Sequence, residues 1–188
     1  MKKTRFFVFA FLMLVFFFTE AQKTLVYAYE DADFYDALEL FNNEKFSVAQ
    51  RKFKKIHDRI DAPHSEIKMN AEYYIALCAL ELFNKDAEYL FIKFIDHHPQ
   101  SPKVRKARYQ LGKYNYRKRR WSNTIKWFEQ VDENDLEASE LGEFNFKFGY
   151  SLFRKKQKAE AKKRFYIVKD LEGDYKVPAL FYYAHLEY

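Results

Sequence analysis

One short pattern recurs four times in this chain at a nearly constant spacing. Each copy has a small residue, an aromatic residue four positions later and an apolar residue three positions after that. The copies begin 38, 37 and 37 residues apart. Because a period of this size is typical of stacked supersecondary units, we expect a solenoid rather than a single globular core. The four copies are Ala49-Phe53-Ile56, Ala87-Phe91-Phe94, Thr124-Phe128-Val131 and Ala161-Phe165-Val168.

Each repeat is expected to form two helices, which places the chain in the all-α class. In the third repeat, Ser101-Pro102 supplies an N-cap and a proline at the first helical position, and the helix is expected to run to about Lys118. Ser122 is expected to cap a second helix that ends at Val131. No alternating run is bounded by hairpin signals, so strands are not expected. The other helices are expected at residues 28–42, 47–59, 66–83, 86–97, 137–155 and 158–171.

The third and fourth repeats resemble the tetratricopeptide repeat (TPR). This resemblance implies an α-solenoid of tandem antiparallel helix pairs, a TPR-like superhelix, with about four repeats and the first helix of a fifth. Two antiparallel helices cross closely only where one of them contributes a small residue. The family period is about 34 residues, so the longer period here is a departure from it. A second departure is that the first two repeats lack a glycine at the positions equivalent to Gly112 and Gly149. The matching residues are Leu111-Gly112, Trp121, Thr124, Phe128, Val131, Phe148-Gly149, Leu152, Ala161, Phe165 and Val168.

One connection between repeats is similar to a particular TPR subgroup. An aromatic-rich helix that contains Phe94 ends at Pro99-Gln100-Ser101-Pro102, where the next helix begins. This arrangement resembles periplasmic TPR proteins of outer-membrane assembly and envelope-division complexes in Gram-negative bacteria. The resemblance implies a scaffold role in the cell envelope.

Residues 1–21 have the features of a secretory signal peptide. A positively charged start is followed by an unbroken apolar run of thirteen residues, 6–18, and Thr19 and Ala21 are the small residues of a cleavage site. The run is short for a membrane span, which needs about 20 residues, although an uncleaved anchor is the alternative. No cysteine follows the run at the cleavage point, so no lipid anchor is expected. Residues 22–188 are then the repeat domain, exported to the periplasm or associated with the outer membrane.

The net charge and the single cysteine argue against a nucleic-acid partner and against an intramolecular disulfide. The leader carries +2, which leaves +4 of the chain's +6 on residues 22–188. This mild positive charge is no nucleic-acid signature, and export argues further against nucleic acid as a partner. The single cysteine, Cys78, has no intramolecular partner, and its apolar neighbours indicate a small buried hydrophobe.

A fifth repeat begins at Val177-Pro178 and reaches only Tyr188. Terminal repeats normally have a polar outer face, whereas residues 180–184 are apolar and aromatic. We therefore expect either a longer repeat protein or a partner that covers this helix.

No catalytic or metal-binding constellation is found in the sequence. His97 and His98 are adjacent, so on a helix their side chains diverge by about 100° and cannot share one metal ion. The sequence has no His-Glu-x-x-His motif, no cysteine pair and no phosphate-binding glycine loop. We expect neither enzymatic activity nor a cofactor or metal.

Two clusters of positive charge lie in equivalent turns of the third and fourth repeats. The repeat places them side by side along one edge of the solenoid, which we call the basic edge. It is either a solvated edge or a strip that meets an acidic protein or an anionic membrane surface. Its residues are Arg117, Lys118, Arg119, Arg120, Lys155 and Lys156.

In TPR proteins the first helix of each repeat lines the concave face. A concave face rich in aromatic residues suits an extended peptide or a partner helix, although aromatic residues at helical spacing also serve as core between repeats. The carboxylate clamp of some family members is absent, because Phe34 and Leu38 stand where Lys and Asn are needed. The residues predicted to bind a partner there are Phe34, Phe41, Tyr109, Lys113, Tyr116, Phe146, Tyr150 and Phe153.

These features favour a non-catalytic protein-binding scaffold of the bacterial cell envelope. The alternative is a carbohydrate- or peptidoglycan-associated module that uses the same aromatic rings as stacking platforms. Few Asp or Asn residues accompany the inward rings, which counts against sugar binding, because sugar sites need many polar contacts.

We predict that the leader is removed after Ala21, so that the mature chain begins at Gln22. Mass spectrometry of the protein from envelope fractions measures this N-terminus. An intact Met1 in a membrane fraction would instead show an uncleaved anchor.

Overall fold

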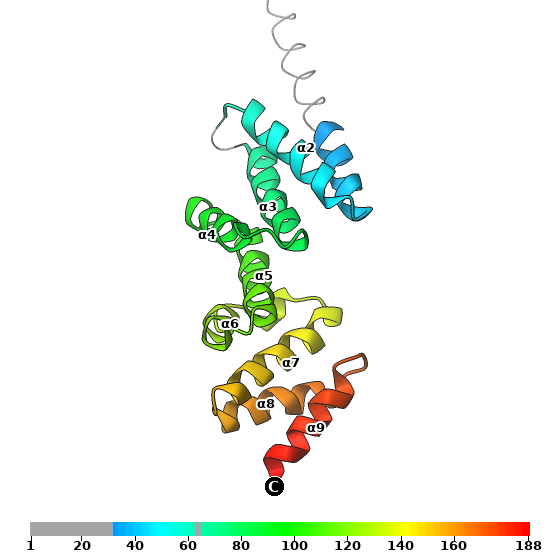
Figure 1. Ribbon diagram of the computed structural model, residues 1–188, viewed down its shortest axis with the longest axis vertical. Helices are drawn as coiled ribbons and strands as arrows, with labels where there is room; N and C mark the ends of the chain where they lie inside the picture. Colours follow the sequence, from blue (N-terminus) through cyan, green and yellow to red (C-terminus); the bar gives the residue numbers. More distant parts are fainter. Residues whose placement is uncertain (1–31, 63–64) are drawn as a thin grey trace, which may run out of the picture. The chain divides into compact units, whose positions relative to one another are not determined.

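The computed structural model describes residues 32–62 and 65–188, which form helices joined by short connections (Figure 1). No strand occurs in these two ranges, so the predicted all-α class is confirmed for them. The expected leader and the expected start of the first helix at residue 28 lie outside the described residues. The chain divides after Asn84 into two compact units, which are described one at a time.

The N-terminal unit contains a helix over residues 32–42, α2 (Phe46–Arg59) and α3 (Glu66–Glu81). Phe53 of α2 is fully buried and stacks on Tyr74 of α3, with ring centroids 5.1 Å apart. The hydroxyl of Ser65 caps α3 by accepting a hydrogen bond from the backbone amide of Lys68. An aromatic seam between α2 and α3 therefore holds this unit together.

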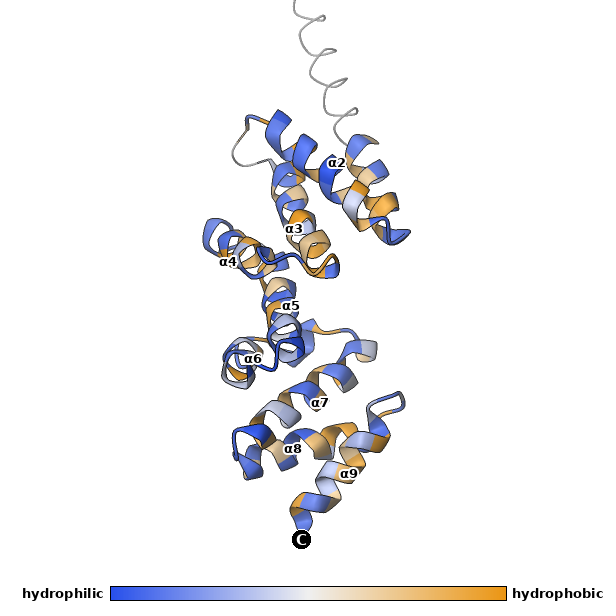
Figure 2. Ribbon diagram, viewed as in Figure 1, coloured by the Kyte–Doolittle hydropathy of each residue, from blue (hydrophilic) through white to orange (hydrophobic). Residues whose placement is uncertain are grey.

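The C-terminal unit is a row of helices in which each packs on the next along the chain, α4 on α5, α5 on α6, and so on to α9. Figure 2 shows that hydrophobic residues are frequent along α8 and α9. This sequential packing is what stacked helix pairs predict. The elements are α4 (Ala87–His97), α5 (Lys103–Arg117), α6 (Trp121–Phe128), the 3-10 turn η1 (Glu133–Asp135), α7 (Ala138–Arg154), α8 (Lys158–Val168) and α9 (Lys176–Glu187).

The recurring sequence pattern is a packing pattern. The aromatic residue of each copy, Phe53, Phe91, Phe128 and Phe165, is at most 1% exposed. The small residue of each copy is also fully buried. The register assigned from the sequence therefore corresponds to the buried face of the second helix in every repeat.

Two glycines allow the helices of the third and fourth repeats to cross closely. A Cβ atom on Gly112 of α5 would lie 2.0 Å from Cε1 of Phe128, and one on Gly149 of α7 would lie 3.1 Å from Cε1 of Phe165. The expectation that a small residue permits the crossing is thus confirmed for both repeats. In each case the aromatic ring of the pattern packs on the glycine backbone.

Helix boundaries agree with the sequence predictions to within a few residues, but two predicted caps are wrong. α5 begins at Lys103 with Pro102, rather than Ser101, at the N-cap position and no side-chain cap. Ser122 lies inside the first turn of α6, which begins at Trp121 and has Arg120 at the N-cap position without a side-chain cap. The turn before α6 explains why this helix begins at Trp121, because the chain enters the helix directly from that turn. Residues after Phe128 and after Val168 form turns, so α6 and α8 end three residues earlier than expected.

A matched pair of glycine substitutions tests the close crossing. We predict that Gly112→Ala lowers the free energy of unfolding by about 1–3 kcal/mol, because the new methyl group overpacks against the buried ring of Phe128. Gly142→Ala, on α7, should raise it by about 0.5–1 kcal/mol, because a Cβ there meets no atom within 4 Å and alanine favours the helix. Chemical denaturation measures both, and equal stability of the two variants would contradict the assigned crossing.

Candidate protein-binding surface

Partly exposed aromatic rings from four helices of the C-terminal unit touch one another in a continuous row. Tyr116 at the end of α5 lies 5.5 Å from Trp121 at the start of α6, measured between ring centroids. Trp121 lies 5.5 Å from Tyr150 of α7, which lies 5.4 Å from Tyr182 of α9. Phe153 of α7 continues the row, 5.2 Å from Tyr182. We call this surface the aromatic band, and it consists of Tyr116, Trp121, Tyr150, Phe153 and Tyr182.

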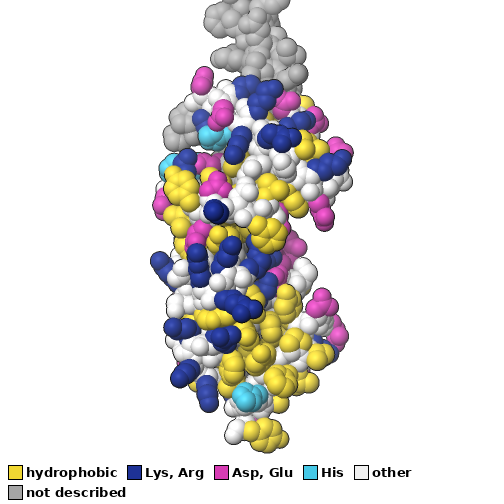
Figure 3. Space-filling model, viewed as in Figure 1, with side chains coloured by type: hydrophobic (Ala, Val, Ile, Leu, Met, Phe, Trp, Pro, Cys, Tyr) yellow, Lys and Arg dark blue, Asp and Glu magenta, His cyan; other side chains and the backbone are white. Residues whose placement is uncertain are grey.

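The repeat explains why these side chains come together. Tyr116 and Phe153 are 37 residues apart, as are Lys113 and Tyr150. Residues at these equivalent positions project from the same face of successive first helices. Figure 3 shows hydrophobic side chains gathered over α7 and α9, with Lys and Arg side chains over α6 and the start of α8. The surface is therefore apolar in its middle and cationic along one side.

Two of the predicted binding residues, Tyr109 and Phe146, are buried in the core. Tyr109 is 1% exposed, and its hydroxyl donates to Glu143, 3.0 Å away on α7. Phe146 is 9% exposed and packs on Phe165 and Tyr175. Both lie in the middle of their helices, where the next helix covers them, and the prediction that they form an open concave surface is corrected for this pair.

In the N-terminal unit, Phe34 and Phe41 are partly buried and belong to the aromatic seam. Phe34 lies 5.5 Å from Phe53 and 5.9 Å from Tyr74, between ring centroids. Phe41 lies 5.3 Å from Phe46 and from Tyr74. Both rings therefore pack the helix over residues 32–42 against α2 and α3. Neither ring belongs to the aromatic band.

A largely buried carboxylate organises the cations beneath the band. Glu143 accepts from the hydroxyl of Tyr109, pairs with Lys113 at 3.2 Å and forms an ion pair with Lys147. Burial opposes ionisation of Glu143, but the hydrogen bond from Lys147 and the charge of Lys113 outweigh it and hold its pKa below the usual value. Burial also lowers the pKa of Lys147, whose ammonium lies 5.5 Å from the ring of Tyr116. One carboxylate therefore faces two ammonium groups, which leaves this part of the surface positive.

Arg154 joins the aromatic band to the basic edge. Its guanidinium lies 5.1 Å from the ring centroid of Trp121, and Nη1 donates to the hydroxyl of Tyr150 at 3.3 Å. Cation–π contacts of this kind hold an arginine in place without neutralising it. No carboxylate pairs with Arg154 in the part of the chain that the structure describes. Its charge remains available to a binding partner.

The basic edge lies in the turns that close each helix pair. Every one of its six residues is exposed, as predicted. In the third repeat, Arg120 pairs with Glu88 of α4 at 2.8 Å, and in the fourth the turn residues Lys155 and Lys156 make no ion pair with a described residue. Lysines and arginines at a helix C-terminus also complement its partial negative charge. Each of these turns therefore concentrates positive charge beside the aromatic band.

The turns share a backbone motif that the sequence analysis did not detect. In each of four turns a residue with left-handed φ makes an amide hydrogen bond to the carbonyl three residues earlier, and the next residue bonds five residues back. This is the Schellman motif, in which glycine is the usual left-handed residue. Here the left-handed residues are Glu44, Phe83, Arg119 and Lys156, with φ of 57°, 58°, 56° and 63°. A non-glycine residue in this conformation carries a cost in backbone strain.

Two members of the band, Trp121 and Tyr182, were not predicted as binding residues. Trp121 was interpreted only as a position of the repeat pattern, and it comes from the second helix rather than the first. Tyr182 lies on α9, for which the four copies of the pattern offer no comparison. A signal was available for Trp121, because tryptophan and arginine are both enriched among the residues that dominate binding energy, and Trp121 directly follows Arg119 and Arg120.

The described residues give little support for metal binding, a membrane span or a reactive thiol. No three His, Cys, Asp or Glu side chains cluster as metal ligands within residues 32–62 and 65–188. No helix over these ranges has both the length and the apolar character of a membrane span. Cys78 is fully buried, and burial raises the pKa of its thiol to about 12, so it stays protonated at neutral pH, as expected for a small hydrophobe.

Comparison with known proteins identifies the fold. Two solved structures of TPR-like repeats from a putative kinesin light chain of Podospora anserina, one of them a single-substitution variant, superpose on this chain with a TM-score of 0.60. Each is 12% identical, and the alignment covers 82% of this chain and 83% of that chain. Family profiles and curated proteins give no match to the sequence. The fold is therefore TPR-like, and at this identity the likeness carries the fold alone.

We predict that Arg119→Gly raises the free energy of unfolding by about 1 kcal/mol relative to Arg119→Ala. Both variants remove the same charge, but only glycine relieves the left-handed strain at φ 56°. Urea denaturation of the two variants gives the difference. If both unfold at the same urea concentration, the turn does not have this backbone conformation in solution.

Proposed function

We propose that this protein is a non-catalytic scaffold that binds a peptide or a helix of another protein through the aromatic band. The observation that carries the proposal is the band itself, five rings in contact across α5, α6, α7 and α9 that remain partly exposed. Tyrosine, tryptophan and arginine supply most of the binding energy in protein interfaces, because they bury large surfaces at low entropic cost. The band holds all three types together, with Arg154 seated on Trp121 and Tyr150.

The basic edge orients the bound segment in this proposal. Lys113, Lys147 and Arg154 lie among the rings, and the exposed turns extend the positive charge away from them. Charges at the rim of an interface act mainly on the rate of encounter and on the choice of partner. A partner segment with acidic residues beside apolar ones fits this distribution.

We further propose that the protein acts in the bacterial cell envelope, in the periplasm or at the outer membrane. The support comes from the sequence: residues 1–21 have the features of a signal peptide, and the Pro99 to Pro102 connection resembles envelope TPR proteins. The partner in this proposal is a component of an envelope complex.

The alternative of carbohydrate or peptidoglycan binding uses the same rings. Sugar recognition needs several free acceptors and donors next to the stacking surface. The carboxylate beneath the band, Glu143, is engaged by Tyr109, Lys113 and Lys147. Protein binding is thus better supported than sugar binding. Identifying whether the purified protein retains a protein or a carbohydrate ligand distinguishes the two alternatives.

We predict that Tyr116→Ala combined with Phe153→Ala weakens partner binding by at least about thirtyfold, the loss expected when even one of the two residues is an interface hot spot worth about 2 kcal/mol. These residues are equivalent in successive repeats, so the double variant removes the same ring from two neighbouring helices. Photo-crosslinking from position 153 in cells identifies the bound protein, and titration of that purified protein measures Kd. Tyr166→Ala is the matched control, because Tyr166 is 54% exposed on α8 and is no member of the band.

Thermal unfolding of all variants separates binding from folding. The proposal requires that the double variant keeps its helical content and a cooperative transition while binding is lost. A double variant that binds as tightly as the Tyr166→Ala control would refute the aromatic band as the site. Sedimentation with isolated peptidoglycan, abolished by the same double substitution, would favour the carbohydrate alternative.

A further inference from the structure

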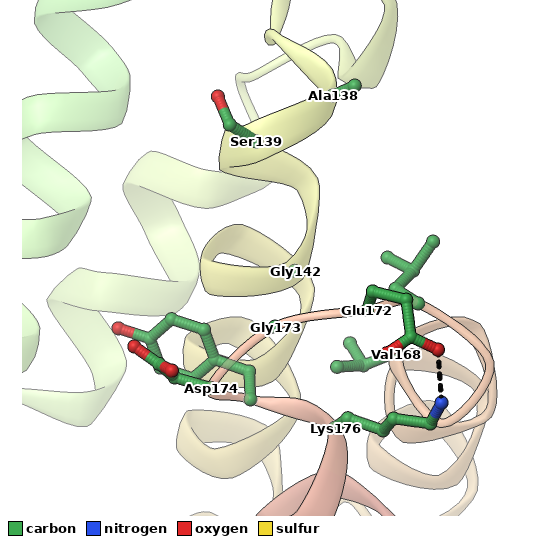
Figure 4. Close-up of a pocket in the computed structure, with 10 residues that line it drawn as sticks. Ala138, Ser139, Gly142, Val168, Glu172, Gly173, Asp174 and Lys176 are labelled. Carbon is green, nitrogen blue, oxygen red and sulfur yellow. Dashed lines mark hydrogen bonds and ion pairs between the residues drawn. The ribbon is translucent and has the colours of Figure 1, made fainter.

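The C-terminal unit has a cavity of about 440 Å³ at the connection between α8 and α9 (Figure 4). It lies at the other end of α8 from the basic turn between α7 and α8 (Figure 1). The first turns of α7, the end of α8 and the loop that leads into α9 form its walls. Val168 and Leu171 contribute apolar surface to its lining, and Glu172 and Asp174 contribute carboxylates. Its size falls within the range of ligand pockets, roughly 300–1,000 Å³.

The third repeat shows which side chains stand at the equivalent positions there. In the third repeat, Arg105 of α5 pairs with Asp135 at 2.8 Å, and the neighbouring Leu136 packs against the core. The equivalent positions in the fourth repeat, 37 residues later, are Gly142, Glu172 and Gly173. The acidic residue is kept, whereas the arginine and the leucine are both replaced by glycine.

The two glycines leave the space open. A Cβ atom on Gly142 would meet no atom within 4 Å, and the same holds for Gly173. Gly173 also has φ of +129°, a conformation that L side chains rarely adopt, so this loop is built around glycine. The cavity thus results from the loss of two side chains that the third repeat retains.

In the fourth repeat, Glu172 pairs with a lysine, which another cation can displace. Glu172 pairs with Lys176 one turn later on the chain, at 2.5 Å, and its side chain is 89% exposed. Exposed ion pairs of this type contribute little, because water screens both charges. Asp174, which also lines the cavity, pairs with no cation of residues 65–188. The lining of the cavity therefore includes carboxylates that are open to another cation.

We propose that this cavity is a socket for an arginine side chain of a second protein. The methylene groups of the arginine lie against Val168 and Leu171, as long charged side chains commonly pack on apolar surface. The guanidinium pairs with Glu172, in the same relation that Arg105 has to Asp135 one repeat earlier. A planar guanidinium binds a carboxylate through two parallel hydrogen bonds, which an ammonium cannot do. The socket is separate from the aromatic band and does not depend on the function proposed for that surface.

The test titrates the full chain with Nα-acetylarginine amide and follows the backbone amides of Gly142 and Gly173 by NMR. We expect saturable shifts at these amides, weaker ones with Nα-acetyllysine amide and none with Nα-acetylleucine amide. Gly142→Arg should abolish the shifts at Gly173, because the introduced guanidinium occupies the socket from within. Gly142→Ala is the matched control and should keep them, since its methyl group meets no neighbour.

A second variant tests the role of Glu172 without filling the cavity. Lys176→Gln removes the competing cation and should tighten binding of the arginine probe by about two- to fivefold, the range expected for one exposed ion pair. Absence of saturable shifts in the wild-type protein overturns the proposal. So does equal binding of the arginine and leucine probes, or unchanged binding in a folded Gly142→Arg variant.

Discussion

The close contact between a glycine on one helix and a phenylalanine on the next determines the geometry of the C-terminal unit. Gly112 accepts the ring of Phe128, and Gly149 accepts the ring of Phe165. Because each ring sits almost on the backbone of the first helix, the two helices of a repeat cross at short distance. This crossing repeats after 37 residues, and it brings equivalent side chains of α5 and α7 to the same face. The aromatic band therefore follows from where the glycines lie.

The turns between the two helices of each repeat determine where positive charge lies on the C-terminal unit. A left-handed residue ends each first helix, and in the third and fourth repeats that residue is Arg119 or Lys156. Glycine would fit the backbone better, so these turns accept strain while presenting a cation at the edge. The opposite edge of the same unit holds the acidic connections around Asp135 and Glu172. The unit is thus polarised from one side to the other, which favours one orientation of a charged partner.

The sequence predicted the helices well because buried aromatic residues recur with a strong period. It predicted which stripe of each first helix faces inward, but not which part of that stripe the next helix covers. Tyr109 and Phe146 lie at covered positions, whereas Tyr116 and Phe153, seven residues further along the same helices, stay partly exposed. Trp121 and Tyr182 join the band from other elements, and periodicity within one helix carries no information on such neighbours. Non-glycine residues in the left-handed turns escaped prediction because turn rules rely on glycine.

Glycine has opposite roles within this one unit, and the repeat makes the contrast measurable. Gly112 and Gly149 recur in both repeats at the position where a ring leaves no room for a side chain. Gly142 and Gly173 instead replace Arg105 and Leu136 of the previous repeat, at positions where a side chain has ample room. The first pair serves packing, since any larger residue would separate the helices. The second pair leaves open a space that the third repeat fills, although at Gly173 the backbone conformation itself disfavours a side chain, and this difference is the reason for regarding the cavity as a binding site rather than as a defect.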